Sequence, residues 1–360
     1  MAQVYWAPKN IFRKMKVVVT VGGTITTETF TISIGGLTFA TFTASSSTAA
    51  QVCAGLVAYW NSTSGTYYQH PWKTMTIADN LDGTITFEAT TAGVVYLMTL
   101  NTPGGSATFS KSTTVSNLSP NDVSVVTNWS GGALPTTSDD VKVPAGTPDM
   151  LWNLDAITAT IDDWHFEPGC GKIGLPAETF QLTPTSIDST VAEYRTTFLT
   201  CKGSDHLIGQ SVQLGLQSAW PVRLKLDTSN VAANIQNYSN AAQVGLHPPV
   251  QIKANHSSTV IHNYGADVGV GEDLWGDTTT ISKAYNYMPN SRMRVGFNVT
   301  VATLEFDAGA KGILGSYPTS ELRLAAGANV EAQAAGTIAK VRGPGTITKR
   351  AFNVVISAIE

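Results

Sequence analysis

The stretch from about Thr196 to Glu360 is a succession of short β-type runs separated by Gly, Asn and Asp, with almost no helical pattern between them. Within many runs the side chains alternate in character, as where Leu322 and Leu324 flank Arg323. A period of two residues is typical of a strand with one buried face. The sequence therefore predicts a fold that is mainly β.

The spacing of these runs favours a parallel β-solenoid, a β-helix-like body assigned to residues 151–360. The runs recur every roughly ten to twenty residues, and each ends in a turn residue. Antiparallel strands need compact reversals, yet Asn-Gly and Asp-Gly dipeptides are absent from this region. No strict repeat is visible, so the coils are expected to be irregular. A set of β-sandwich domains is the alternative.

Residues 16–115 predict a small α+β module ahead of the body. Three strand-like runs, KVVVTVGG, ETFTISIGG and LTFATFTA, come first, and Gly35-Gly36 is expected to form the turn of a hairpin. A helix follows, with Ser46 or Ser47 as its cap and four apolar side chains at helical spacing, Val52, Leu56, Tyr59 and Trp60. Two further strands, DGTITFEAT and GVVYLMTL, complete the module.

The composition suits long-lived β structure and excludes some partners. Charged residues are 13% of the 360 residues, against roughly 25% in ordinary globular proteins. A net charge of −4 without a basic stripe argues against nucleic acid as a partner. No apolar run is long enough to span a bilayer, and no secretion signal is recognised. Three isolated cysteines are predicted to be small buried residues of a chain folded in a reducing cytoplasm: Cys53, Cys170 and Cys201.

Two segments are predicted to make contacts rather than to perform chemistry. Residues 1–15 read as an N-terminal arm that docks on a partner through five apolar or basic side chains in and beside it: Trp6, Phe12, Arg13, Lys14 and Lys16. Residues 116–150 read as a linker and a cap that seals the open end of the solenoid. The cap residues are Trp129, Gly131, Gly132 and Pro135, in the segment NWSGGALPTTSDDVKVPAG.

The segments TFTISIGG, NWSGGALPTTSDDVKVPAG, IGLP and EYRTTFL, taken together, resemble virion proteins of tailed bacteriophages and prophages, which couple a small α+β module to a β-helical body. The resemblance implies a non-enzymatic structural protein of the virion, assembled in the bacterial host cytoplasm. It implies a homotrimer that decorates the capsid and contacts the major capsid protein or other virion proteins. A tail spike or fibre that recognises host surface glycan is one alternative, and a polysaccharide-degrading tailspike enzyme is another.

Candidate chemical groups are few, and no catalytic, cofactor or metal site is predicted. Glycan hydrolysis needs two carboxyl groups some 5 to 9.5 Å apart, and the adjacent pairs are Asp139-Asp140, Asp162-Asp163 and Glu272-Asp273. The pair beside Trp164 is the better candidate, although neighbours on a strand point to opposite faces. Three histidines lie in one region without metal-ligand spacing, His247, His256 and His262. The acidic loop 267–280 lacks the EF-hand order of calcium ligands.

Overall fold

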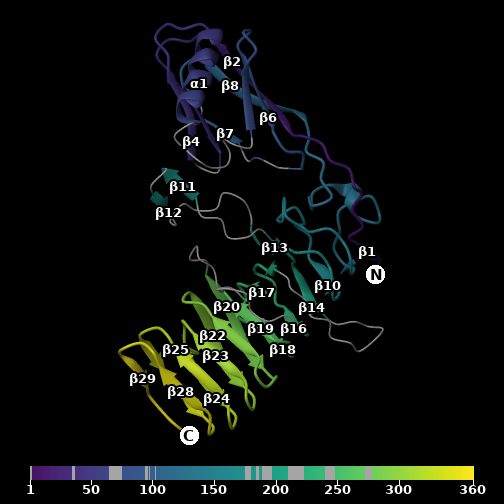
Figure 1. Ribbon diagram of the computed structural model, residues 1–360, viewed down its shortest axis with the longest axis vertical. Coiled ribbons are helices and arrows are strands. Elements are labelled where there is room, and N and C mark those ends of the chain that lie inside the picture. Colours follow the sequence, from purple (N-terminus) through teal and green to yellow (C-terminus); the bar gives the residue numbers. More distant parts are fainter. Residues whose placement is uncertain are drawn as a thin grey trace. The chain divides into compact units, whose positions relative to one another are not determined.

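The computed structural model describes residues 2–34, 37–64, 75–93, 96, 98–101, 103–174, 180–183, 186–188, 197–209, 223–239, 248–271 and 278–360. These residues form two compact units, each with its own hydrophobic core (Figure 1). We call the unit built mainly from Asn10–Asp122 the N-terminal unit and the other unit the body. Several predicted features lie outside the described residues: the Gly35-Gly36 turn, SVQLGL, most of EYRTTFL, His247 and Glu272-Asp273.

The N-terminal unit contains two antiparallel sheets and a helix. One sheet has the order β5 (Met75–Asp79), β6 (Thr84–Ala89), β2 (Lys16–Gly23), β8 (Ala107–Val115), and the other has the order β4 (Leu37–Thr43), β3 (Thr29–Ile34), β7 (Met98–Leu100). Alternation explains the burial in β2, where Val17, Val19 and Val21 enter the core. A separate antiparallel pair joins β11 (Phe180–Thr183) to β12 (Ser186–Asp188).

Helix α1 (Ala49–Ser64) begins with a reciprocal capping box. The backbone N–H of Gln51 donates to Thr48 Oγ1 at 3.2 Å, and the backbone N–H of Thr48 donates to Gln51 Oε1 at 2.8 Å. These two bonds identify Thr48 as the cap, and not Ser46 or Ser47 as predicted. Ser46 instead adopts a left-handed conformation with φ of 52°. Val52, Leu56 and Trp60 enter the core as predicted, whereas Tyr59 stays exposed.

The body consists mainly of two parallel sheets (Figure 1). The ten-strand sheet has the order β1 (Gln3–Tyr5), β9 (Asp140–Val143), β10 (Ile161–Phe166), β14 (Gly203–Ile208), β16 (Asn234–Asn237), β18 (Val260–Asn263), β20 (Thr279–Asn286), β22 (Val299–Phe306), β24 (Glu321–Leu324), β27 (Val341–Arg342). The eight-strand sheet has the order β13 (Leu199–Thr200), β15 (Leu224–Asp227), β17 (Val250–Lys253), β19 (Asp267–Val270), β21 (Arg292–Val295), β23 (Lys311–Leu314), β25 (Asn329–Ala332), β28 (Thr346–Lys349). A short parallel pair joins β26 (Gly336–Ile338) to β29 (Val354–Ile356), and η1 (Val126–Asn128) is a 3-10 turn.

Successive strands from β13 to β25 belong to the two sheets in turn, so each strand pairs with the next but one along the chain. The number of positions between paired residues varies along the stack: Ile161 pairs with Gly203, 42 positions on, Asp267 pairs with Arg292, 25 positions on, and Asn329 pairs with Thr346, 17 positions on. The strand pairs of both sheets are parallel, unlike those of the antiparallel sandwich considered as an alternative. The protein is thus mainly β, with parallel sheets that are compatible with a β-helix.

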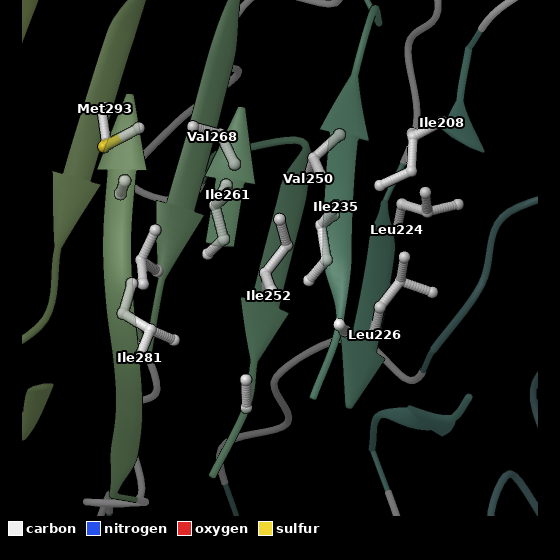
Figure 2. Close-up of a cluster of buried hydrophobic side chains, with 14 of the residues drawn as sticks. Ile208, Leu224, Leu226, Ile235, Val250, Ile252, Ile261, Val268, Ile281 and Met293 are labelled. Atoms are coloured by element: carbon white, nitrogen blue, oxygen red, sulfur yellow. The ribbon is translucent and has the colours of Figure 1, made fainter. Parts of the chain in front are cut away.

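The two sheets share one apolar core. Leu224, Val250 and Val268 align on three neighbouring strands of the eight-strand sheet, and Ile235 aligns with Ile261 in the ten-strand sheet. Figure 2 shows these side chains pointing into the space between the strands of the two sheets. Each is at most 2% exposed. The alternation predicted from the sequence therefore places this apolar face inside.

A row of amides crosses this core on three adjacent strands. Asn237 Nδ2 donates to Asn263 Oδ1 at 2.8 Å, and Asn263 Nδ2 donates to Asn286 Oδ1 at 2.7 Å. The row ends where Asn286 Nδ2 donates to the Lys311 carbonyl at 3.1 Å. Buried amides are stable only when hydrogen-bonded. We call these three residues the asparagine ladder, and it fixes the register of β16, β18 and β20.

Trp6 and Trp129 meet at the β1 end of the ten-strand sheet. Their ring centroids are 4.9 Å apart in an edge-to-face arrangement, and both side chains are buried. The backbone N–H of Trp6, directly after edge strand β1, donates to the Lys142 carbonyl at 2.9 Å. Indole N–H groups donate to the carbonyls of Pro148 and Val123. The prediction that residues 1–15 form an arm that is not part of a core is wrong for its first part, because residues 3–6 pair with the body and Trp6 enters its core.

His206 makes the body sensitive to acid. Its Nε2–H donates to the Cys201 carbonyl at 2.6 Å, and Nδ1 has no hydrogen-bond partner among the described residues. Burial lowers its pKa from 6.5 to about 4. Below pH 6.5 the unfolded chain binds a proton that the folded chain does not, so the free energy of unfolding falls by about 2 to 3 kcal/mol between pH 7 and pH 4.5.

This pH dependence is measured by urea denaturation of the body at pH 7 and pH 4.5. His206→Gln removes the titrating ring, and its loss of stability between the two pH values should be smaller than that of the wild type. Equal losses in the two proteins would contradict the assignment, whatever the stability of the variant at pH 7.

Candidate functional site

The parallel register of the ten-strand sheet places chemically similar side chains in rows on its outer face. Positions that alternate with the buried ones align from strand to strand, as where Gln236, His262 and Tyr285 are successive partners. Three groups follow one another along this face, and together we call them the outer strip: the acid row Asp140, Asp163 and Asp205; the aromatic group Tyr238, His262, Tyr264, Tyr285 and Tyr287; and the ion-pair group Glu305, Glu321, Arg323, Arg342 and Glu360.

The aromatic group consists of five half-buried rings in nearly parallel planes. Tyr264 is central: its ring centroid lies 4.9 Å from that of Tyr238 and 4.7 Å from that of Tyr287, with interplanar angles of 13° and 10°. His262 and Tyr285 stack at 5.0 Å and 11° beside them. Such contacts contribute roughly 0.5–1.5 kcal/mol per pair. The rings therefore form one ordered platform rather than independent surface side chains.

Hydrogen bonds fix the polar edges of this platform. Tyr238 Oη donates to Gln236 Oε1 at 2.9 Å, and Tyr287 Oη lies 3.0 Å from His262 Nδ1. Burial is the largest cause of raised pKa values in Tyr238 and Tyr287, and it lowers the pKa of His262. The platform is therefore uncharged at neutral pH. It presents apolar ring surface together with hydroxyl and amide groups.

The sequence pointed to carboxylates at adjacent positions such as Asp162-Asp163, whereas the acid row brings together carboxylates from three different strands. Asp163 pairs in register with Asp140 on one side and Asp205 on the other, so its neighbours lie across strands and not along the chain. Burial raises the pKa of Asp163, and the charges of Asp205, Asp140 and Asp162 raise it further. Asn234 Nδ2 donates to Asp205 Oδ1 at 2.9 Å. This row was not predicted, because only the register between distant segments creates it.

The ion-pair group is a connected network on β22, β24, β27 and the C-terminal residue. Glu321 lies 2.6 Å from both Arg323 and Arg342, and Arg342 lies 2.9 Å from Glu360. The hydrogen bond from Arg323 is the main cause that lowers the pKa of Glu321. Two guanidinium groups offset two of the three carboxylates in this group, so it adds polar contacts to the outer strip with only a small net negative charge.

The five residues predicted to form a partner-binding arm do not belong to one structural unit. Trp6 belongs to the core of the body, whereas Phe12, Arg13, Lys14 and Lys16 belong to the N-terminal unit. Arg13 is tied to the chain by its backbone N–H to the Leu118 carbonyl and its Nε to the Ser116 carbonyl, both at 2.9 Å. Lys16 pairs with Glu88 at 3.1 Å. Phe12 remains half exposed, with 53% of its surface accessible.

The predicted cap residues lie around Trp129. Gly132 has φ of 68° and donates its backbone N–H to the Trp129 carbonyl at 2.9 Å, which is a tight turn that favours glycine. Pro135 is buried, and Gly131 is exposed. Asp139 accepts hydrogen bonds from the backbone and hydroxyl of Thr136, consistent with the turn role predicted for it.

The remaining histidines and cysteines that the sequence singled out, where the structure describes them, are hydrogen-bonded, stacked or buried. His256 Nδ1 accepts from the backbone of Ser258, and His262 belongs to the aromatic group. Burial of the three cysteines is confirmed, and it raises the pKa of each thiol, that of Cys53 to about 12. Within the described ranges, no cluster of three or more His, Cys, Asp or Glu side chains has an arrangement suited to a metal ion. No helix in the same ranges has the length and apolar character to cross a membrane.

The outer strip is thus an extended assembly of aromatic and polar side chains that the register builds on the body. It combines an uncharged platform of rings, amide and hydroxyl groups, and carboxylates on neighbouring strands. A site of this chemistry can bind a ligand that has both apolar faces and many hydroxyl groups. Comparison with known proteins found no matching protein family, no matching curated protein and no matching solved structure.

Proposed function

We propose that this chain is a non-enzymatic structural protein of a tailed-phage virion, with a β-solenoid body that binds a host surface glycan through the outer strip. Two observations support the solenoid: both large sheets are parallel, and successive strands alternate between them. The resemblance of the segments NWSGGALPTTSDDVKVPAG and TFTISIGG to virion proteins supports the location. Assembly takes place in the cytoplasm of the bacterial host, and the protein is a homotrimer.

The observation that carries glycan binding is the platform centred on Tyr264. A pyranose ring has an apolar C–H face and a rim of hydroxyl groups, so it matches aromatic surface flanked by hydrogen-bonding side chains. Gln236 and Lys283 lie beside the rings, and the acid row begins with Asp205 on β14, the strand next to β16. Because the sheet is continuous, several sugar units of one chain can contact successive strands.

The proposal has two forms, which differ in where the protein lies on the phage particle: on the head as a decoration protein, or on the tail as a spike or fibre. Head decoration, in contact with the major capsid protein, is supported by exposed apolar side chains available for attachment, among them Phe12. A tail spike or fibre is supported by the outer strip, since receptor recognition is the direct use of a glycan-binding face. Cryo-electron microscopy of intact particles decides between them: decoration requires many copies that match capsid stoichiometry, and a spike requires few copies at one vertex.

Glycan binding is tested with Tyr264→Ala on an array of bacterial surface polysaccharides. Loss of the central ring should weaken binding of the recognised polysaccharide about tenfold, equivalent to about 1.4 kcal/mol. Tyr59→Ala, which removes an exposed tyrosine of helix α1, is the matched control and should bind as the wild type does. Undiminished binding by Tyr264→Ala would refute a role for the strip. Release of new reducing ends from the bound polysaccharide would instead indicate an enzyme.

A further inference from the structure

A polar pocket of about 370 Å³ lies on the body at the turns after β15 and β17. It is lined by Asp227, Ser229, Asn230, Lys253, Asn255 and Thr278. Its volume falls within the range of roughly 300–1,000 Å³ typical of small-molecule sites. These residues do not belong to the outer strip, which follows the strands of the ten-strand sheet, so the pocket is a separate feature of the body.

Backbone hydrogen bonds at the turns after β15 and β17 hold the pocket in shape. Ser229 adopts φ of 54°, and its N–H donates to Asp227 Oδ1 at 2.7 Å, which orients that carboxylate. The N–H of Asn255 donates to the Ser229 carbonyl at 2.6 Å, and the N–H of Thr280 donates to the Ala254 carbonyl at 2.8 Å. The polar groups are therefore positioned before a ligand arrives, which reduces the entropy lost on binding.

The charges in the pocket favour an uncharged ligand. Asp227 Oδ2 lies 4.0 Å from Lys253 Nζ, and the other four lining side chains are neutral amides or hydroxyls. An anion would meet the carboxylate, and a cation would meet the ammonium group. A neutral molecule with several hydroxyl groups can donate to Asp227 and accept from Lys253 at the same time.

Two amides in the pocket remain available for hydrogen bonding. Within the part of the chain that the structure describes, the side chains of Asn230 and Asn255 make no hydrogen bond, and both residues are exposed. Each amide offers donors and an acceptor, the combination that neighbouring sugar hydroxyls need. From the cavity, its rigid turns, its balanced charges and these amides, we infer that the pocket binds a neutral saccharide of one or two units. This site goes beyond the proposed function of the outer strip.

Saturation-transfer NMR on the full chain tests the inference with five probes: D-glucose, D-galactose, N-acetyl-D-glucosamine, D-glucuronate and protonated D-glucosamine. At least one of the three neutral sugars should bind, and the two charged sugars should bind more weakly. Asn230→Ala and Asn255→Ala should each weaken the neutral sugar about fivefold, the effect of roughly 1 kcal/mol of lost hydrogen bonding. Asn329→Ala, at an exposed position of β25, is the control and should leave the affinity unchanged.

The strip variant Tyr264→Ala separates this inference from the proposed function. A signal that persists in Tyr264→Ala but weakens in Asn230→Ala and Asn255→Ala establishes the pocket, whatever the strip binds. A signal that disappears in Tyr264→Ala and persists in both amide variants assigns these sugars to the strip and overturns the pocket. Absence of binding by all three neutral sugars also overturns it. Unchanged melting temperatures of the variants show that binding, and not folding, has been altered.

Discussion

Replacing Trp6 with alanine is expected to lower the free energy of unfolding of the body by about 3 to 5 kcal/mol, the usual cost of truncating a buried tryptophan. The ring is fully buried, packs edge to face on Trp129 and donates from Nε1 to the Pro148 carbonyl. Against a typical domain stability of roughly 5 to 15 kcal/mol, this is a large loss. Calorimetry should show a lower melting temperature for the body.

The two separate cores provide an internal control for this experiment. The N-terminal unit has its own buried cluster around Leu56 and Trp60, so its transition should not move in Trp6→Ala. Trp129→Ala should have a similar effect on the body, and the double variant should lose less than the sum, because the two rings contact each other. A body transition unmoved by either substitution would show that something else closes this end of the ten-strand sheet.

Breaking the asparagine ladder with Asn263→Ala is expected to destabilise the body by about 3 to 5 kcal/mol. The substitution removes the acceptor of hydrogen bonds from Asn237 Nδ2 and the Gly265 N–H, and the donor to Asn286 Oδ1. Each buried polar group left without a partner costs about 1–3 kcal/mol. Urea denaturation measures the change, and β16, β18 and β20 should lose hydrogen-exchange protection first.

The control for the ladder is Asn329→Ala, which removes an exposed amide from strand β25 of the same body. Surface substitutions of this kind usually change stability by less than about 0.5 kcal/mol. If Asn263→Ala were no more destabilising than Asn329→Ala, the ladder would be a consequence of the packing and not a cause of the register.

Local patterns in the sequence predicted the local features of the fold. The alternation of Leu322, Arg323 and Leu324 was sufficient to place the two leucines inside and the arginine outside. Lys225 shows the limit of that rule: it alternates with Leu224 and Leu226, yet it is only 6% exposed and lies over the Phe198 ring. A packing partner from another segment, Phe198 directly before β13, contributes to its burial, and periodicity contains no information about that partner.

The outer strip could not be predicted because it depends on register between segments that are far apart in sequence. Asp140, Asp163 and Asp205 are neighbours only because three strands align at those positions. The same holds for Tyr238, Tyr264 and Tyr287, which are separated by more than twenty residues each. The burial of Trp6 was not predicted for a related reason. Its partner Trp129 is over a hundred residues away in the sequence, so residues 1–15 were predicted to be an arm outside any core.

The short spacing between the last paired strands has a consequence for the order in which the body closes. Bringing two strands together restricts the chain between them, and this entropic cost rises with the logarithm of the intervening length. The Asn329–Thr346 pairing closes 17 positions and the Ile161–Gly203 pairing closes 42, a difference of about 0.8 kcal/mol in favour of the shorter closure. During synthesis, the closures with the lowest entropic cost therefore belong to the part of the chain that leaves the ribosome last.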